Sequence, residues 1–482
     1  SFTDTTATAN TRLIYKIKAC SSTTICSALV SAAPIAIKSE FHSLIVTDVA
    51  TLTAADFSLQ SVLTRLADQL SFANPTDPVT ADSLFQRMWD TQNPAPGTSG
   101  VRGPKCTGSL NGFQHECRTS EGKQVLNPST FINNYQPIAL VNRFDLRDSV
   151  TFRDCGEARV VYGLRSNVQT ATNRNFIIFE AQLPNPQPGS AAGCLPIANF
   201  WNTLSDASDV AKRANELRNF YFNGIPAQSI TPVIHKDNYA PTSGQIRTNQ
   251  FLSNANLSWV LNEFKITIEN GISIVKPVSV KSNPFGELFR GGNADARALP
   301  FQNEFIANMS TLLTDRDSFF LKVANDSHNN GESHANGADV AENNFASHFA
   351  QGTTSFRDAV TQKLVASSVT NISAAQVINR ATAMTCGGCH MPSAFQLTSA
   401  NSIAAGVSWP DSLGFVHISE TLSAGQREFT VSPAMRTAFL PARKRNFVQY
   451  LNSFGVSATN ATFLQKTSEP VATPTLTGKR SG

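Results

Sequence analysis

The sequence predicts an α+β protein in which a β-rich, disulfide-containing N-terminal body precedes a mainly helical C-terminal domain. Three observations support this fold class. Apolar runs rich in β-branched and aromatic residues, which are typical of strands, are concentrated between residues 137 and 275. Amphipathic helical spacing dominates from about residue 340 onward. Six of the eight cysteines precede residue 200 and follow one another as three pairs.

A chain of 482 residues is long enough to form several domains with a sizeable buried core. The changes in composition along it predict four segments. These are a mixed N-terminal region (1–135), a β-rich body (136–340), a helical domain (341–456) and a tail rich in Pro and Thr (457–482).

The N-terminal region contains one clear helical pattern. Residues 53–70 place apolar side chains on one helix face, namely Leu59, Val62, Leu63, Leu66 and Leu70. Thr53 and Asp56 have the spacing of a capping box, which predicts where this helix begins. Residues 91–135 are rich in Pro, Gly, Asn and Ser, so we expect a long irregular connection there.

The β-rich body is predicted from three strand-like runs, 137–146, 158–164 and 175–183. Residues 264–275 predict a hairpin, because Asn270 and Gly271 suit the two positive φ angles of a type I′ turn. Two helices, near 206–222 and 299–314, are expected to interrupt the strands.

The C-terminal domain is predicted to be helical from three patterns. Residues 355–368 and 373–384 read as amphipathic helices, and Ser373 is a suitable N-cap for the second. Residues 441–455 begin with Pro and end with Gly, which is the usual asymmetry of helix ends.

The cysteine pattern favours an oxidising compartment. The simplest of the 15 pairings that six cysteines allow joins neighbours, because short loops close at little entropic cost: Cys20–Cys26, Cys106–Cys117 and Cys155–Cys194. The chain also begins at Ser1 with a polar stretch, as a mature product does after removal of a leader. We therefore expect a periplasmic or extracellular protein. A chain shortened for expression and six free thiols are the alternatives.

Composition and hydropathy argue against binding to nucleic acid and against a membrane-spanning segment. Charged residues make up 15% of the chain and the net charge is only +4, without the basic stripe of a nucleic-acid-binding protein. No run of 18 apolar residues occurs, so no transmembrane segment is predicted. The composition makes no prediction about the oligomeric state.

The stretch Thr385–Met391 contains a Cys-x-x-Cys-His motif, formed by Cys386, Cys389 and His390. Two thiols at this spacing can add across the two vinyl groups of one haem, and the adjacent imidazole can then bind the iron. We expect the two intervening glycines to leave room for the porphyrin edge. A redox-active dithiol, a zinc site and a plain disulfide are the alternatives.

Residues 370–456, with a helix before the motif and another closing the unit, resemble a c-type cytochrome. The resemblance implies one covalent haem c, with thioethers at Cys386 and Cys389 and with His390 as the proximal iron ligand. It also implies single-electron transfer to or from a redox partner protein.

The distal side of the iron has three candidate states: His417 as ligand, Met435 as ligand, or an open site. Much of the chain also resembles a set of large exported bacterial proteins of unknown function. The segments that carry this second resemblance are ALVNRFDLRD, CGEARVVYG, FIIFEAQLP, QIRTNQF, WVLNEFKI, TCGGCH and GFVHIS. Its pattern includes a histidine equivalent to His417 but no fixed methionine like Met435, which favours His417. An open iron would instead favour an enzyme, a peroxidase- or oxygenase-like oxidoreductase whose N-terminal body forms a substrate pocket.

Two further groups of polar residues are candidate sites. Residues 324–348 are dense in oxygen and nitrogen donors, namely His328, His334, His348, Asp326, Glu332, Asp339 and Glu342, which suits either a metal site or a solvated loop. Strand alternation places Glu157 and Arg159 on one face, where we expect an ion pair.

Overall fold

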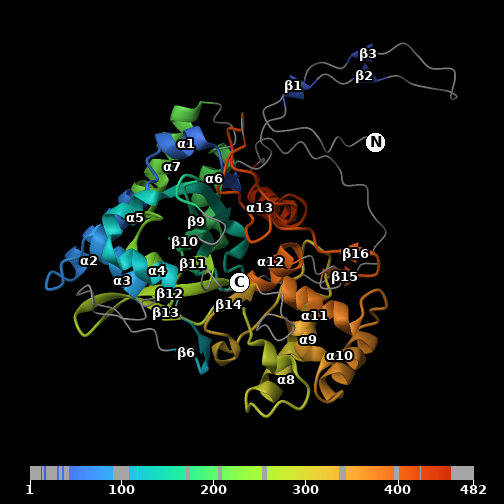
Figure 1. Ribbon diagram of the computed structural model, residues 1–482. Coiled ribbons are helices and arrows are strands. Elements are labelled where there is room, and N and C mark those ends of the chain that lie inside the picture. Colours follow the sequence, from blue (N-terminus) through green and yellow to red (C-terminus); the bar gives the residue numbers. More distant parts are fainter. Residues whose placement is uncertain are drawn as a thin grey trace.

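The computed structural model describes residues 43–90, 108–116, 118–169, 174–204, 209–251, 258–335, 344–395, 401–423 and 425–456, together with four two-residue strands between residues 12 and 36. All structural statements below concern these residues. A large sheet runs through the molecule; α1, α2, α3, α5 and α7 of the N-terminal half lie on one side of it, and α8 to α12 of the C-terminal half lie on the other, while α6 and α13 lie next to each other (Figure 1). The α+β prediction is confirmed at this level.

The central sheet is antiparallel and has the strand order β13-β12-β11-β10-β9-β8-β5, with β14 also paired to β12. Its strands are β5 (Ile45–Val46), β8 (Tyr135–Arg143), β9 (Asp154–Leu164), β10 (Asn175–Pro184), β11 (Gln245–Phe251), β12 (Trp259–Glu269), β13 (Ile272–Val278) and β14 (Ser333–Ala335). The three strands predicted from apolar runs are therefore confirmed. They lie in the middle of the sheet, where side chains on both faces are buried.

The predicted hairpin joins β12 to β13. Asn270 and Gly271 have φ angles of 51° and 72°, and Glu269 pairs with Ile272 across the turn. The Asn-Gly pair therefore predicts the hairpin at this edge of the sheet correctly.

Helices from the N-terminal half pack beside the sheet. They are α1 (Val49–Ala54), α2 (Leu59–Ala73), α3 (Ala81–Asp90), α5 (Pro128–Asn134), α6 (Leu195–Leu204) and α7 (Val210–Asn223). The apolar face predicted for residues 53–70 is buried in α2, but the predicted start is wrong. Ser58 caps α2 by accepting a hydrogen bond from the Ser61 amide (3.2 Å), whereas Thr53 belongs to the separate helix α1 and Asp56 has a φ of 48°.

Residues 108–134 are more regular than the composition predicts. They form the hairpin β6 (Gly108–Leu110) and β7 (Phe113–His115), then α4 (Thr119–Gly122), the 3-10 turn η1 (Lys123–Leu126) and α5. The missed signal is the Asn111–Gly112 pair, whose φ angles of 54° and 74° are those of a tight hairpin turn. Residues 91–107 lie outside the described part of the chain.

The C-terminal half is mainly helical, and its helices begin before residue 341, where the predicted helical domain starts. Its elements are η6 (Gly286–Phe289), α8 (Ala298–Asn308), η7 (Met309–Leu312), η8 (Asp326–His328), α9 (Phe345–Ala350), α10 (Ser355–Ala366), α11 (Ala374–Ala383), α12 (Cys386–Phe395), β15 (Ser402–Ala404), β16 (Val407–Ser408), the π-helical turn η9 (Met435–Phe439) and α13 (Leu440–Ser453). Ser373 caps α11 in a full capping box with Gln376. The helices predicted at 299–314, 355–368, 373–384 and 441–455 are therefore present.

Two clusters of buried apolar side chains stabilise these halves. The larger one surrounds the sheet and includes residues of α13, so that Phe447 and Tyr450 pack on Phe144 with ring centroids 5.6 and 4.6 Å apart. The smaller one is formed mainly by residues 285–409 and includes Cys389. The last helix thus closes onto the sheet, while the helices that lead into Cys386 have a core of their own.

The predicted disulfide between Cys155 and Cys194 is present, and it joins β9 to the turn before α6. The other two predicted pairs involve Cys20, Cys26, Cys106 and Cys117, which lie outside the described residues, as does the tail from residue 457. Within the described residues, no helix is both long enough and apolar enough to cross a membrane.

Candidate functional site

The Cys-x-x-Cys-His motif opens helix α12, directly after α11. Thr385 stands between the two helices and receives the Gly388 amide hydrogen bond on its hydroxyl (3.1 Å) and the Cys389 amide hydrogen bond on its carbonyl (3.0 Å). Thr385 therefore caps the new helix, which begins at Cys386.

The two glycines of the motif are closely packed within the protein, which gives a reason for glycine at both positions besides the predicted room for the porphyrin edge. A Cβ atom on Gly387 would lie 2.2 Å from the backbone oxygen of His334, in β14. A Cβ atom on Gly388 would lie 2.3 Å from the backbone oxygen of Thr382. The Gly387 amide also donates to the Ser333 hydroxyl (2.8 Å). Glycine thus lets α12 lie directly against the edge of the sheet.

Three of the predicted site residues meet in one place. The rings of His390 and His417 have centroids 4.4 Å apart, and the Cys389 sulfur lies 3.3 Å from His417 Nε2. The Trp409 indole N–H donates to the same sulfur at 3.4 Å. The fold thereby brings into contact His390 and His417, which are 27 positions apart along the chain.

Burial keeps this group of side chains uncharged. It lowers the pKa of His390 to about 4, although a hydrogen bond to the backbone of Gly414 acts in the opposite direction. It also lowers the pKa of His417, with smaller effects from His390 and Arg443 in the same direction. Burial raises the pKa of the Cys389 thiol to about 12. Both imidazoles are therefore neutral near pH 7, which is the form that binds metals.

Ser432 orients His417, a role that the sequence did not indicate to us. Its hydroxyl lies 2.8 Å from His417 Nδ1 and accepts the Met435 amide hydrogen bond at 3.1 Å. Its own amide donates to the His417 carbonyl (2.8 Å). The signal is the dipeptide Ser432–Pro433, a typical N-cap followed by proline, which places a polar side chain at a helix start.

Met435 lies in the first turn of the same helical segment and is buried in the larger core. Its connection to the site runs through Ser432, which bonds the Met435 amide on one side and the His417 ring on the other. The structure therefore brings His417 rather than Met435 against His390. Cys386 lies on α12 beside the sheet.

Cys386 faces a chain of buried ion pairs on the sheet, formed by Glu157, Arg159, Glu180, Arg247 and Glu263. Successive N–O distances along this ion-pair chain are 2.5, 2.7, 3.4 and 3.0 Å. The predicted pair Glu157–Arg159 is thus confirmed as its first link. Burial raises the pKa of the Cys386 thiol, while the positive charge of Arg247 acts in the opposite direction.

The histidines of residues 324–348 do not converge. Each lies beside a different glutamate: His328 with Glu304 (2.8 Å), His334 with Glu332 (2.8 Å) and His348 with Glu287 (3.4 Å). Asp339 and Glu342 lie outside the described residues. Among the described residues, no group of three or more Cys, His, Asp or Glu side chains could hold a metal ion.

The donor set of the motif fits a haem, because two thiols share one helical turn and two neutral imidazoles lie next to one of them, Cys389. One of these imidazoles offers an available atom, since His390 Nδ1 is buried without a hydrogen-bond partner in the described part of the chain. The spacing does not admit a porphyrin between the two rings, because their centroids are 4.4 Å apart and the rings, inclined at 41°, are in direct contact. Binding a haem there requires the segment that carries His417 to move away from α12.

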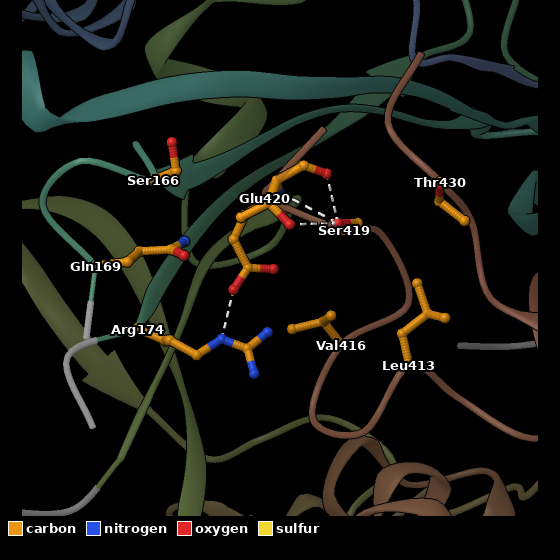
Figure 2. A pocket seen from close by; sticks show the side chains of 9 residues that line it. Ser166, Gln169, Arg174, Leu413, Val416, Ser419, Glu420 and Thr430 are labelled. Carbon is orange, nitrogen blue, oxygen red and sulfur yellow. Dashed lines mark hydrogen bonds and ion pairs between the residues drawn. The ribbon is translucent and has the colours of Figure 1, made fainter. Parts of the chain in front are cut away.

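The segment that carries His417 also lines a cavity of about 640 Å³ (Figure 2). The loop after β9 contributes Ser166, Gln169 and Arg174, and residues 413–430 contribute Leu413, Val416, Ser419, Glu420, Thr421 and Thr430. Arg174 Nε forms an ion pair with Glu420 Oε1 inside it. Val416 lines the cavity and directly precedes His417, so the cavity and the histidine pair share one segment.

Comparisons with protein-family models, with curated proteins and with solved structures found no match for this chain.

Proposed function

We propose that this protein is an exported monohaem c-type cytochrome that transfers single electrons. The observation that carries the proposal is the contact of Cys389, His390 and His417 at the start of α12. Two thiols, an adjacent imidazole and a second imidazole from a remote segment are the groups that a covalent, doubly ligated haem requires.

In the proposed holo-protein, Cys386 and Cys389 hold the haem as thioethers, His390 is the proximal ligand and His417 the distal ligand. When bound, the haem supplies a reversible one-electron change of the iron. A thioether has no proton to lose, so it suits the apolar surroundings that raise the pKa of the Cys389 thiol.

Neighbouring side chains keep these groups in place. Ser432 fixes the orientation of the His417 ring, as partners of ligating histidines do in metal sites. The Trp409 indole, which is 4% exposed, covers Cys389 and keeps water away from it. The protein thus supplies orientation and a dry environment, which are the terms by which a protein tunes a haem.

The same contact between Cys389 and His417 resembles a nucleophile and its base, which is a rival interpretation. Three features argue against it. The thiol is 6% exposed, its pKa is raised to about 12, and the pKa of His417 is lowered. A catalytic thiol needs the opposite conditions, a lowered pKa and access for a substrate.

Export and a redox partner follow from the same proposal. The Cys155–Cys194 disulfide supports an oxidising compartment. An electron carrier must exchange electrons with another protein, and the N-terminal body offers a large surface for such a partner.

A second candidate is a haem c oxidoreductase with a substrate pocket, and the cavity beside His417 favours it. Residues between 166 and 174 of the N-terminal body line the cavity together with residues between 413 and 430, the segment that includes His417. The enzyme hypothesis requires such a shared lining. In this case, movement of the segment that carries His417 would withdraw this imidazole from a bound haem.

Electronic spectra of the oxidised and dithionite-reduced holo-protein test the ligand assignment. We expect six-coordinate low-spin iron in the wild type and in Met435→Leu. His417→Ala should give high-spin iron that binds cyanide or CO. High-spin iron in the wild type would favour the enzyme, and high-spin iron in Met435→Leu alone would identify Met435 as the distal ligand.

A further inference from the structure

The cavity beside His417 contains polar groups that the protein does not use. Arg174 contributes only Nε to its ion pair with Glu420, and its two terminal NH₂ groups have no hydrogen-bond partner within the described residues. Glu420 contributes one carboxylate oxygen to that pair and keeps the other free of protein partners in the same part of the chain. The two NH₂ donors of the Arg174 guanidinium therefore lie beside a carboxylate oxygen of Glu420 that can accept a hydrogen bond.

Further polar atoms surround this pair. Gln169 donates its amide N–H to the Leu164 carbonyl (2.9 Å), so its side-chain oxygen remains available in the cavity. Figure 2 shows the Gln169 side chain directed toward Arg174 and Glu420. The hydroxyls of Ser166 and Thr430 border the same space and can either donate or accept.

One wall of the cavity is apolar. Leu413 and Val416 project from the C-terminal segment on the side opposite Gln169 (Figure 2). The cavity is open to solvent, and its volume of about 640 Å³ is large enough to hold a small molecule, for which sites of roughly 300–1,000 Å³ are usual. A ligand of matching shape has a polar end at the ion pair and an aliphatic end at this wall.

The charges decide which polar end fits. An anion that approaches Arg174 meets the carboxylate of Glu420, and a cation that approaches Glu420 meets the guanidinium of Arg174. A zwitterion with adjacent opposite charges satisfies both residues. Its carboxylate can accept hydrogen bonds from the two NH₂ groups of Arg174, and its ammonium can donate to the second carboxylate oxygen of Glu420. Free α-amino acids have this arrangement.

We propose that the cavity binds a free α-amino acid with an aliphatic side chain. Its carboxylate pairs with Arg174, its ammonium with Glu420 and Gln169, and its side chain packs on Leu413 and Val416. The binding stands on the cavity alone and does not depend on a haem.

Isothermal titration calorimetry of the full chain with L-leucine tests this inference. We expect saturable binding of leucine, and at least tenfold weaker binding of N-acetyl-L-leucine, which lacks the ammonium, and of L-leucinol, which lacks the carboxylate. These comparisons use the wild-type protein, so they are independent of the folding of any variant.

Variants test the assigned residues. Arg174→Gln and Glu420→Gln should each weaken leucine binding at least tenfold, whereas Arg427→Gln, an exposed arginine outside the cavity lining, should bind as the wild type does. The inference is overturned by an absence of saturable heat with leucine, by equal binding of N-acetyl-L-leucine or glucose, or by unchanged binding in both cavity variants. Haem content, measured separately, reports on the proposed function and not on this cavity.

Discussion

At the scale of single residues, Ser432 links the histidine pair to the fold. Its hydroxyl both caps a helix start and contacts His417 Nδ1. Ser432→Ala should lower the free energy of unfolding by about 1 kcal/mol, the usual cost of a lost N-cap. It should also change the spectrum of the bound haem, because the His417 ring loses its orienting partner.

Urea unfolding and visible spectra measure the two effects of this change. Ser423→Ala is a matched control, because Ser423 is exposed and no hydrogen bond involving its hydroxyl occurs within the described part of the chain. A Ser432→Ala protein with wild-type stability and an unaltered haem spectrum would contradict the role assigned to this hydroxyl.

At the scale of elements, the position of α12 depends on Gly387. In an open helix, Gly→Ala stabilises by up to about 1 kcal/mol because of helix propensity. Here the added methyl group would lie 2.2 Å from the His334 backbone, so we expect Gly387→Ala to destabilise by about 1–3 kcal/mol instead. The urea midpoint of Gly387→Ala, compared with that of the wild type, distinguishes the two effects. A lower midpoint is expected, and a higher midpoint would refute the close packing of α12 on β14.

The ion-pair chain on β9–β12 gives a second prediction at this scale. Arg247→Met leaves Glu180 and Glu263 buried without their shared cation, which should cost about 3–5 kcal/mol. Lys276→Met is the control, because Lys276 pairs with Glu269 at the surface and should cost no more than about 1 kcal/mol. Chemical denaturation of both variants tests the difference, and equal costs would contradict it.

At the scale of the whole molecule, the Cys155–Cys194 disulfide closes a loop of 39 residues between β9 and α6. Chain-entropy arguments for a loop of this length give about 4 kcal/mol of stabilisation. The double variant Cys155→Ala/Cys194→Ala should therefore unfold at a lower urea concentration than the wild type. Dithiothreitol should lower the wild-type midpoint by more than that of the variant, which keeps only the other two predicted disulfides, and an equal effect of reduction on both proteins would be inconsistent with this role.

Much of this architecture could be predicted from local patterns. Asn270–Gly271 predicted a hairpin, the strand-like runs predicted the central strands, and Ser373 predicted the start of α11. The contact of His417 with Cys389 was not predicted, since resemblance favoured His417 only as a distal haem ligand and a contact between residues 28 positions apart leaves no local signal. The cavity at Arg174 and Glu420 joins residues 246 positions apart, and no local pattern reports such a pairing.

The intact mass of the protein, purified from cells that attach haem to proteins, tests the central proposal most directly. We predict the mass of the polypeptide plus one haem, retained under denaturing conditions, and the mass of the polypeptide alone for Cys386→Ala/Cys389→Ala. A wild-type protein with the mass of the bare polypeptide would contradict the assignment of a covalent haem to Cys386 and Cys389.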